Sequence, residues 1–136
     1  MDETDAKIIS MLLQKGNSTN TEMARQLGIT EAAVRKRIDK LLAEGAIKKF
    51  TIELGSLGVS ALVLVCAEPH APVDKVAAKI SKLPNVISVH ELSGNYDLAV
   101  VLSAPSSNEI NSTVDAMRTL QYVATTDTRI ILRKWP

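Results

Sequence analysis

The sequence predicts an α+β protein made of two small domains. It has 136 residues, of which 46% are hydrophobic and 23% are charged, a composition typical of globular proteins and sufficient for one ordinary domain or two small ones. The hydrophobic pattern changes near residue 55, from a helical period before it to alternating strand and helix patterns after it. We therefore expect domains at residues 1–54 and 59–136, joined by a Gly-containing hinge at residues 55–58.

The first domain is predicted to contain three helices. The first follows Asp2, Thr4 or Asp5 as candidate caps, and the second opens at Thr21. Only Gly28 and Ile29 separate the second helix from Thr30, which can cap the third, and this tight joint predicts a helix-turn-helix. The β-type residues at 46–54 predict a strand or wing after it. The apolar positions assigned to the core of the first and third helices are Ile8, Ile9, Leu12, Leu13, Val34, Ile38, Leu41 and Leu42.

The second domain is predicted to follow the order strand, helix, strand, strand, helix, strand. Branched apolar runs indicate the strands, and apolar residues at helical spacing indicate the helices. This order is that of a ferredoxin-like βαββαβ domain. The expected strands are Val59–Glu68, Val86–Leu92, Tyr96–Ser103 and Val123–Trp135, and the expected helices carry Val73 to Leu83 and Ile110 to Leu120.

Two of these strands are apolar on both faces. Residues 61–67 and 98–102 are almost entirely aliphatic, although two helices can cover only one face of a four-stranded sheet. The other face would form a large exposed apolar patch. We expect a second copy to cover it in a symmetric homodimer. The alternative is that the N-terminal domain folds over the same face.

Composition excludes several classes of function. A single cysteine, Cys66, excludes an intrachain disulfide and a Cys-rich zinc site, and two histidines, His70 and His90, argue against a catalytic metal centre. Four aromatic residues are too few for a base-stacking platform. We expect no cofactor and no catalytic residues. The absence of a long apolar run and of a signal-like start predicts a cytoplasmic protein without membrane contact.

The net charge of +1 conceals a local concentration of cations. Residues 35–49 carry six basic and two acidic side chains, whereas residues 51–136 carry seven basic and eight acidic ones. Small residues at the start of the third helix, followed by cations, suit a helix that enters the major groove of double-stranded DNA. Arg35 and Lys36 are candidates for contacts at or near base edges. The remaining candidates are Thr30, Arg37, Lys40, Lys48 and Lys49 for phosphates, with Glu31 and Ala32 on the same outward side.

Motifs over nearly the whole chain resemble the Lrp/AsnC, or feast/famine, transcriptional regulators, in particular their archaeal lysine-responsive members. The similar segments are residues 1–9, the recognition segment at residues 27–38, residues 44–48, and Gly94-Asn95-Tyr96-Asp97. The resemblance implies an N-terminal winged helix-turn-helix, a hinge, and a ferredoxin-like domain that dimerises through its sheets and often assembles into octamers. It also implies an amino-acid effector bound between dimers.

The resemblance also implies where the effector binds. Gly94 would let backbone N–H groups approach a carboxylate, and Asp97 would accept from an α-ammonium group or orient the loop. The family often has an acidic residue where this chain has Asn95, so one negative charge is absent. Asp127 is a candidate partner for a basic side chain, which favours a lysine-type effector. The full effector set is Gly94, Asn95, Tyr96, Asp97, Thr125, Thr126 and Asp127. The alternative is that residues 94–97 are only a hairpin turn and Asp127 a solvated acid.

The function that these inferences favour is a sequence-specific transcriptional regulator whose DNA binding and assembly respond to an amino acid. Two recognition helices of a dimer would enter successive major grooves about one helical turn apart. An amino-acid-sensing assembly module without direct DNA binding is one alternative. A subunit resembling haem-pathway decarboxylases is another, although no nucleophile with a base and no phosphate-binding glycine loop is present in the sequence.

Overall fold

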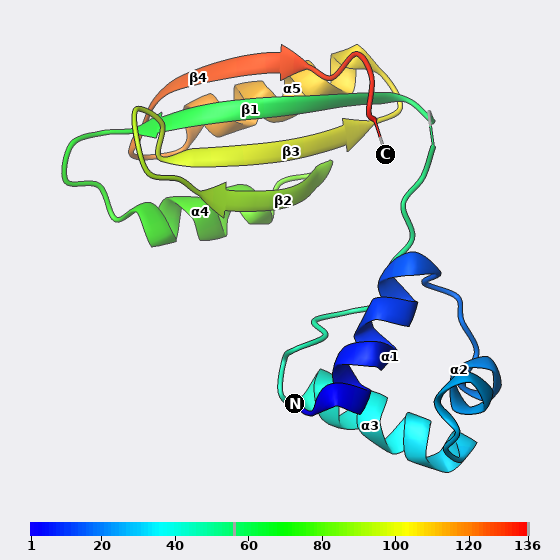
Figure 1. Cartoon of the computed structure of the whole chain (residues 1–136). Helices are drawn as coiled ribbons and strands as arrows, with labels where there is room; N and C mark the ends of the chain where they lie inside the picture. The colour runs from blue at the N-terminus through cyan, green and yellow to red at the C-terminus, as the bar shows by residue number, and fades with distance from the viewer. Residues whose placement is uncertain (56, 136) are drawn as a thin grey trace. The chain divides into compact units, whose positions relative to one another are not determined.

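The computed structural model describes residues 1–55 and 57–135, which form two compact units that divide between Leu54 and Gly55 (Figure 1). The predicted hinge includes Ser56, which lies outside the described residues. Gly58 has a φ of +128°, and a Cβ built on it would lie 2.4 Å from the carbonyl oxygen of Ala104. Only glycine fits there, because the backbone conformation and the close approach both exclude a side chain.

The N-terminal unit consists of α1 (Glu3–Gln14), α2 (Asn20–Leu27) and α3 (Glu31–Ala43). Each helix is capped by a side chain that accepts a hydrogen bond from the backbone N–H three residues later. The caps are Asp2, Thr19 and Thr30, so α2 begins slightly before the predicted Thr21. Gly28 ends α2 in the left-handed conformation, which confirms the tight joint of the helix-turn-helix.

The core of this unit is narrower than the sequence predicts. Ile8, Met23, Ala24, Val34 and Ile38 form its buried cluster, and Leu41 of α3 is buried as well. Leu13 and Leu42, which were expected in the core, are 82% and 37% exposed. The prediction was wrong for these two leucines because three short helices can enclose only one narrow stripe of each helix.

No strand is formed over the described residues 46–54, so the strand predicted for this wing segment is absent. The backbone N–H of Ile47 donates to the carbonyl of Leu41 (3.0 Å), which ties the start of the segment to α3. Beyond it, Phe50, Ile52 and Leu54 are exposed. An extended segment needs a neighbouring strand to satisfy its hydrogen bonds, and the chain by itself offers none here.

The C-terminal unit is a four-stranded antiparallel sheet with two helices, in the predicted βαββαβ order. The sheet order is β2-β3-β1-β4, and Figure 1 shows α4 and α5 on the same side of it. Aliphatic side chains of β1 and β3 pack against Ile80, Ile110 and Met117 in the core. The elements are β1 (Val59–Ala67), α4 (Val73–Ser81), β2 (Val86–Glu91), β3 (Leu98–Ala104), α5 (Ser107–Thr119) and β4 (Val123–Ile130).

Two strand boundaries differ from the prediction by two residues or more, and the other boundaries agree to within one residue. Tyr96 and Asp97 precede β3 and belong to the β2–β3 loop, where the N–H of Leu92 donates to the carbonyl of Asp97 (2.9 Å). β4 ends at Ile130 instead of continuing to Trp135. Its ladder with β1 ends at the pair of Ala61 and Ile130, followed by one hydrogen bond from the N–H of Ile131 to the carbonyl of Ser60 (2.9 Å). β1 begins at Val59, so it offers little more backbone for the chain after Ile131 to pair with.

The two central strands, β1 and β3, are apolar on both faces, as predicted. Val63, Val65 and Val100 are fully buried on the helix side. By the alternation of strand residues, Leu64 and Val101 lie on the opposite face, which we call the free face, and both are half-buried. In the part of the chain that the structure describes, no helix has the length and apolar character needed to cross a membrane.

Candidate functional site

α3 presents one polar side and one buried side. Val34, Ile38 and Leu41 are buried toward the other helices. The predicted DNA-contacting residues of α3 lie on the opposite side, as helical periodicity requires. The exposed members of that set are Thr30, Glu31, Ala32, Arg35, Lys36 and Lys40, and Lys48 and Lys49 after the helix are exposed as well.

Two cations of this surface form exposed ion pairs within α3. Arg35 lies 3.3 Å from Glu31, and Lys40 lies 3.8 Å from Glu44. Exposed pairs of this kind contribute little to stability and exchange readily with water or another anion. Lys36, Lys48 and Lys49 have no recorded ion pair among the described residues. These five cations are therefore available to an approaching polyanion.

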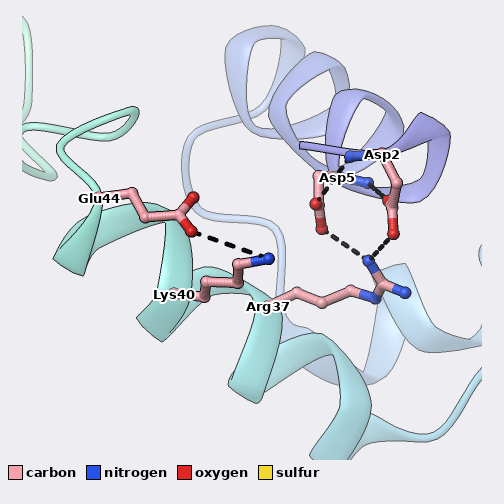
Figure 2. A network of polar contacts seen from close by, with 5 residues as sticks. All are labelled: Asp2, Asp5, Arg37, Lys40 and Glu44. Carbon is pink, nitrogen blue, oxygen red and sulfur yellow. Dashed lines mark hydrogen bonds and ion pairs between the residues drawn. The ribbon is translucent and has the colours of Figure 1, made fainter.

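Arg37 differs from the other cations. Its Nη1 atom lies 2.7 Å from Oδ2 of Asp2 and 2.7 Å from Oδ1 of Asp5 (Figure 2). The sequence predicted Arg37 as a phosphate contact, whereas the structure places it between two carboxylates at the start of α1. Sequence analysis treated Asp2 and Asp5 only as helix caps and missed this role. No local pattern relates them to a residue more than thirty positions later.

The same two carboxylates form a capping box. The N–H of Asp2 donates to Oδ2 of Asp5 (3.0 Å), and the N–H of Asp5 donates to Oδ1 of Asp2 (2.8 Å). The hydrogen bond from Arg37 and the backbone bond of Asp5 lower the pKa of Asp2 from 3.8 to about 2. The backbone bond of Asp2 and the bond from Arg37 also lower the pKa of Asp5. Both groups therefore remain ionised at neutral pH.

The β2–β3 loop is held against β1 by its own residues. Oδ2 of Asp97 accepts from the N–H of Ala67 (2.7 Å), and the Cys66 thiol donates to the carbonyl of Asn95 (3.2 Å). Gly94 has a φ of +107°, which side chains rarely adopt. Asp97 therefore orients the loop, one of the two roles that the sequence analysis considered for it.

Two members of the predicted effector set meet next to this loop. The Tyr96 hydroxyl donates to Oδ2 of Asp127 (3.2 Å), and Nη2 of Arg129 donates to the same oxygen (3.0 Å). The hydrogen bond and the charge of Arg129 lower the pKa of Asp127, so this carboxylate is ionised. Sequence analysis missed Arg129, although the two-residue spacing in a strand places it beside Asp127 on the free face.

Thr126 lies on the other face of β4, so the structure does not bring the whole predicted effector set together. Its hydroxyl accepts from Nε of Arg118 (3.0 Å), which belongs to α5. A groove of about 320 Å³ runs beside them and is lined by Asn111, Val114, Asp115, Arg118 and Thr128.

This groove carries both signs of charge. Arg118 lies 3.6 Å from Asp115, and the buried hydroxyl oxygen of Thr128 has no hydrogen-bond partner in the described structure. The sequence signal that could have found the groove is the spacing of Asn111, Asp115 and Arg118 on one face of α5.

Comparison with known proteins places both units in described families. Residues 1–48 match a winged helix-turn-helix DNA-binding domain, and residues 60–135 match the Lrp/AsnC ligand-binding domain. The chain is 40% identical over 136 residues to the HTH-type transcriptional regulator LysM of Saccharolobus solfataricus, covering 99% of this chain and 96% of LysM.

Two further matches agree with this. Identity to the HTH-type transcriptional regulator FL11 of Pyrococcus horikoshii is 34% over 136 residues, with 98% of this chain and 90% of FL11 covered. The crystal structure of PH0061 superposes with a TM-score of 0.88 at 26% identity, covering 100% of this chain and 95% of that one. Both relatives matched by sequence are named as HTH-type transcriptional regulators.

We expect Asp5→Asn to lower the urea midpoint of the N-terminal unit at neutral pH. The two Asp pKa values are lower in the folded protein than the usual 3.8, so ionisation stabilises the fold above that pH. This contribution is lost as the pH falls from about 4 toward 2. The difference from wild type should therefore be constant above about pH 5 and shrink below pH 4.

Urea unfolding followed by far-ultraviolet circular dichroism measures this difference. Asp39→Asn, an exposed acid on α3 without a recorded ion pair in the described structure, is the matched control. A destabilisation by Asp5→Asn that is as large at pH 2 as at pH 7 would contradict the assignment.

Proposed function

We propose that this chain, which belongs to the Lrp/AsnC family of DNA-binding transcriptional regulators, contacts DNA through α3 and responds to an amino-acid effector bound by its C-terminal unit. The observation that carries the first part is the exposed cationic side of α3 in a chain whose net charge is only +1. The local field on this surface, and not bulk charge, would attract the duplex.

The side chains on α3 suit a helix placed in the major groove. Ala32 near its N-terminus leaves room for the backbone to approach base edges, and Arg35 and Lys36 extend from the next turn. We assign base-edge contacts to these two cations because guanidinium and ammonium groups donate to guanine O6 and N7. Thr30, Lys40, Lys48 and Lys49 would hold phosphates.

The apolar free face supports a homodimer as part of this proposal. Leu64 and Val101 would otherwise keep apolar surface in water, and an isologous contact between two sheets would remove it. Two copies would then present two α3 helices to a pseudo-palindromic site. Further assembly of dimers, up to an octamer, belongs to the same proposal.

The charges around β4 support an amino-acid effector. An amino acid carries a carboxylate and an ammonium group, and both Asp127–Arg129 and Asp115–Arg118 offer the opposite charges side by side. The name LysM of a relative identifies lysine as the amino acid to test first. Binding that favours one arrangement of dimers would change DNA affinity through linkage alone.

Lys40→Ala and Lys49→Ala should each weaken binding to all duplexes alike and reduce the slope of log K against log salt by about one unit, because each removes one phosphate contact. Arg35→Ala should lose about 1 to 3 kcal/mol of discrimination at one base position. Fluorescence anisotropy over a salt series measures both effects. The control is Lys75→Ala, which changes an exposed lysine on α4. Unchanged affinity in Lys40→Ala, Lys49→Ala and Arg35→Ala would refute the assignment.

Sedimentation velocity should show a dimer or larger species for the wild type at micromolar concentration. Leu64→Glu places a charge on the free face and should shift the protein toward monomer, because burial of an unpaired carboxylate is unfavourable. Lys79→Glu, an exposed change on α4, should leave the assembly intact. A wild-type protein that sediments as a stable monomer would rule out this interface.

Isothermal titration against the twenty amino acids should give binding of at least one, with lysine as the first candidate. Asp127→Asn should weaken that binding roughly tenfold or more, since a hydrogen bond to a charged group is lost. Asp74→Asn on α4 serves as the control with the same charge change. Absence of heat with all twenty would favour a regulator that works without an amino acid.

A further inference from the structure

α3 is attached to each of the other two helices by a polar contact. At its first residue, Glu31 accepts from the hydroxyl of Thr21 in α2 (3.0 Å). Near its middle, Arg37 donates from one nitrogen to the carboxylates of Asp2 and Asp5 at the start of α1 (Figure 2). The second contact joins residues that are 35 and 32 positions apart in the chain.

We infer that Asp2, Asp5 and Arg37 form a clamp that sets the rotation of α3 about its own axis and thereby aims its DNA-contacting side chains. The three are positioning residues, and Arg37 is not a phosphate contact. This inference rests on the proposed function of α3, and it assigns to Arg37 a different role from the one that its charge alone predicts.

The core beneath α3 fixes which side of the helix faces inward, through the buried side chains of Val34, Ile38 and Leu41. These residues are aliphatic, and apolar burial is less directional than a hydrogen bond. Charge-assisted hydrogen bonds are directional and short. The clamp therefore adds an angular constraint to the one that packing provides.

The clamp is placed where a small rotation has a large effect on the proposed interface. Arg37 is adjacent in sequence to Lys36 and lies one turn before Lys40, as Figure 2 shows for Lys40. Release of Arg37 would let both neighbouring cations move relative to the phosphates and base edges they are proposed to meet. Arg37 itself is only 33% exposed in its side chain, less than Arg35 at 65% or Lys40 at 58%.

The surroundings of the two carboxylates of the clamp, Asp2 and Asp5, favour their ionised form. The Asp5 side chain is 3% exposed, yet both of its carboxylate oxygens are satisfied, one by Arg37 and the other by the N–H of Asp2. The lowered pKa values of both aspartates keep both carboxylates ionised, and thus able to accept from Arg37, at neutral pH.

The two roles considered for Arg37, phosphate contact and positioning of α3, predict opposite changes in DNA affinity for the variant Asp2→Asn. If Arg37 contacts a phosphate, then Asp2→Asn removes a negative charge beside the DNA and frees the guanidinium, so affinity should rise. If the clamp positions α3, the same change should lower affinity. Asn caps helices as well as Asp does, so α1 keeps its cap in this variant.

The experiment uses the full chain and two duplexes of equal length, one selected by the wild-type protein from a random pool and one of scrambled sequence. The variants are Asp2→Asn, Arg37→Gln, Arg37→Lys and the double variant Asp2→Asn/Arg37→Gln, with Lys40→Ala as the reference for a phosphate contact. Anisotropy titrations over a salt series give affinity and slope for each. Circular dichroism at the assay temperature verifies that each variant is folded, and Asp2→Asn is preferred to a change at the buried Asp5 for this reason.

We expect Asp2→Asn and Arg37→Gln to weaken binding to the selected duplex by about 3- to 10-fold, with an unchanged salt slope and little change for the scrambled duplex. The double variant should be no weaker than Arg37→Gln alone, because both changes open the same clamp. Arg37→Lys should recover part of the loss. A general loss of folded protein would instead weaken binding to both duplexes in proportion.

Two results would overturn the clamp, provided that Lys40→Ala still weakens binding. One is tighter or unchanged binding by Asp2→Asn, and the other is a salt slope reduced by about one unit in Arg37→Gln. If Lys40→Ala and Arg35→Ala had no effect, or if no duplex were enriched from the pool, the proposed function of α3 would fail and the clamp with it. The two failures are therefore distinguishable.

Discussion

Two helices can cover only one face of a four-stranded sheet, and this constraint determines how the C-terminal unit is built. α4 and α5 protect the side that carries Val63, Val65 and Val100. The free face keeps Leu64 and Val101 half-buried, although no helix of its own unit lies on it. The proposed dimer follows from this imbalance, and the paired presentation of two α3 helices follows from the dimer. The proposed assembly and the proposed paired contact with DNA thus both depend on one uncovered surface.

The cations of the N-terminal unit fall into two groups with different chemistry. Arg35 and Lys40 have exposed partners four residues away, at Glu31 in α3 and at Glu44 directly after it, and a phosphate can replace these partners at little cost. Arg37 has partners on another helix, one of them almost completely buried. The number of charges in the sequence does not distinguish these two groups. They are distinguished by whether the acidic partner is buried and whether it lies on another element.

The region around β4 uses both faces of an edge strand. Asp127 and Arg129 meet Tyr96 on the free face, while Thr126 meets Arg118 on the helix face. An incoming amino acid would have to exchange with hydrogen bonds that already exist, so its affinity would be a difference between two sets of contacts. Such an exchange is how a small ligand can shift one packed arrangement toward another.

Local features of the sequence determined most of the architecture. Helix periodicity, the cap at Thr30 and the glycine at residue 28 act over a few residues, so the helix-turn-helix and the βαββαβ order could be predicted, as could the outward cationic side of α3. Tertiary structure alone decided that Leu13 and Leu42 stay exposed, that residues 46–54 form no strand, and that Arg37 faces Asp2 and Asp5. Those outcomes depend on which distant segments meet, and hydrophobic periodicity does not identify partners that lie 32 or 35 residues away.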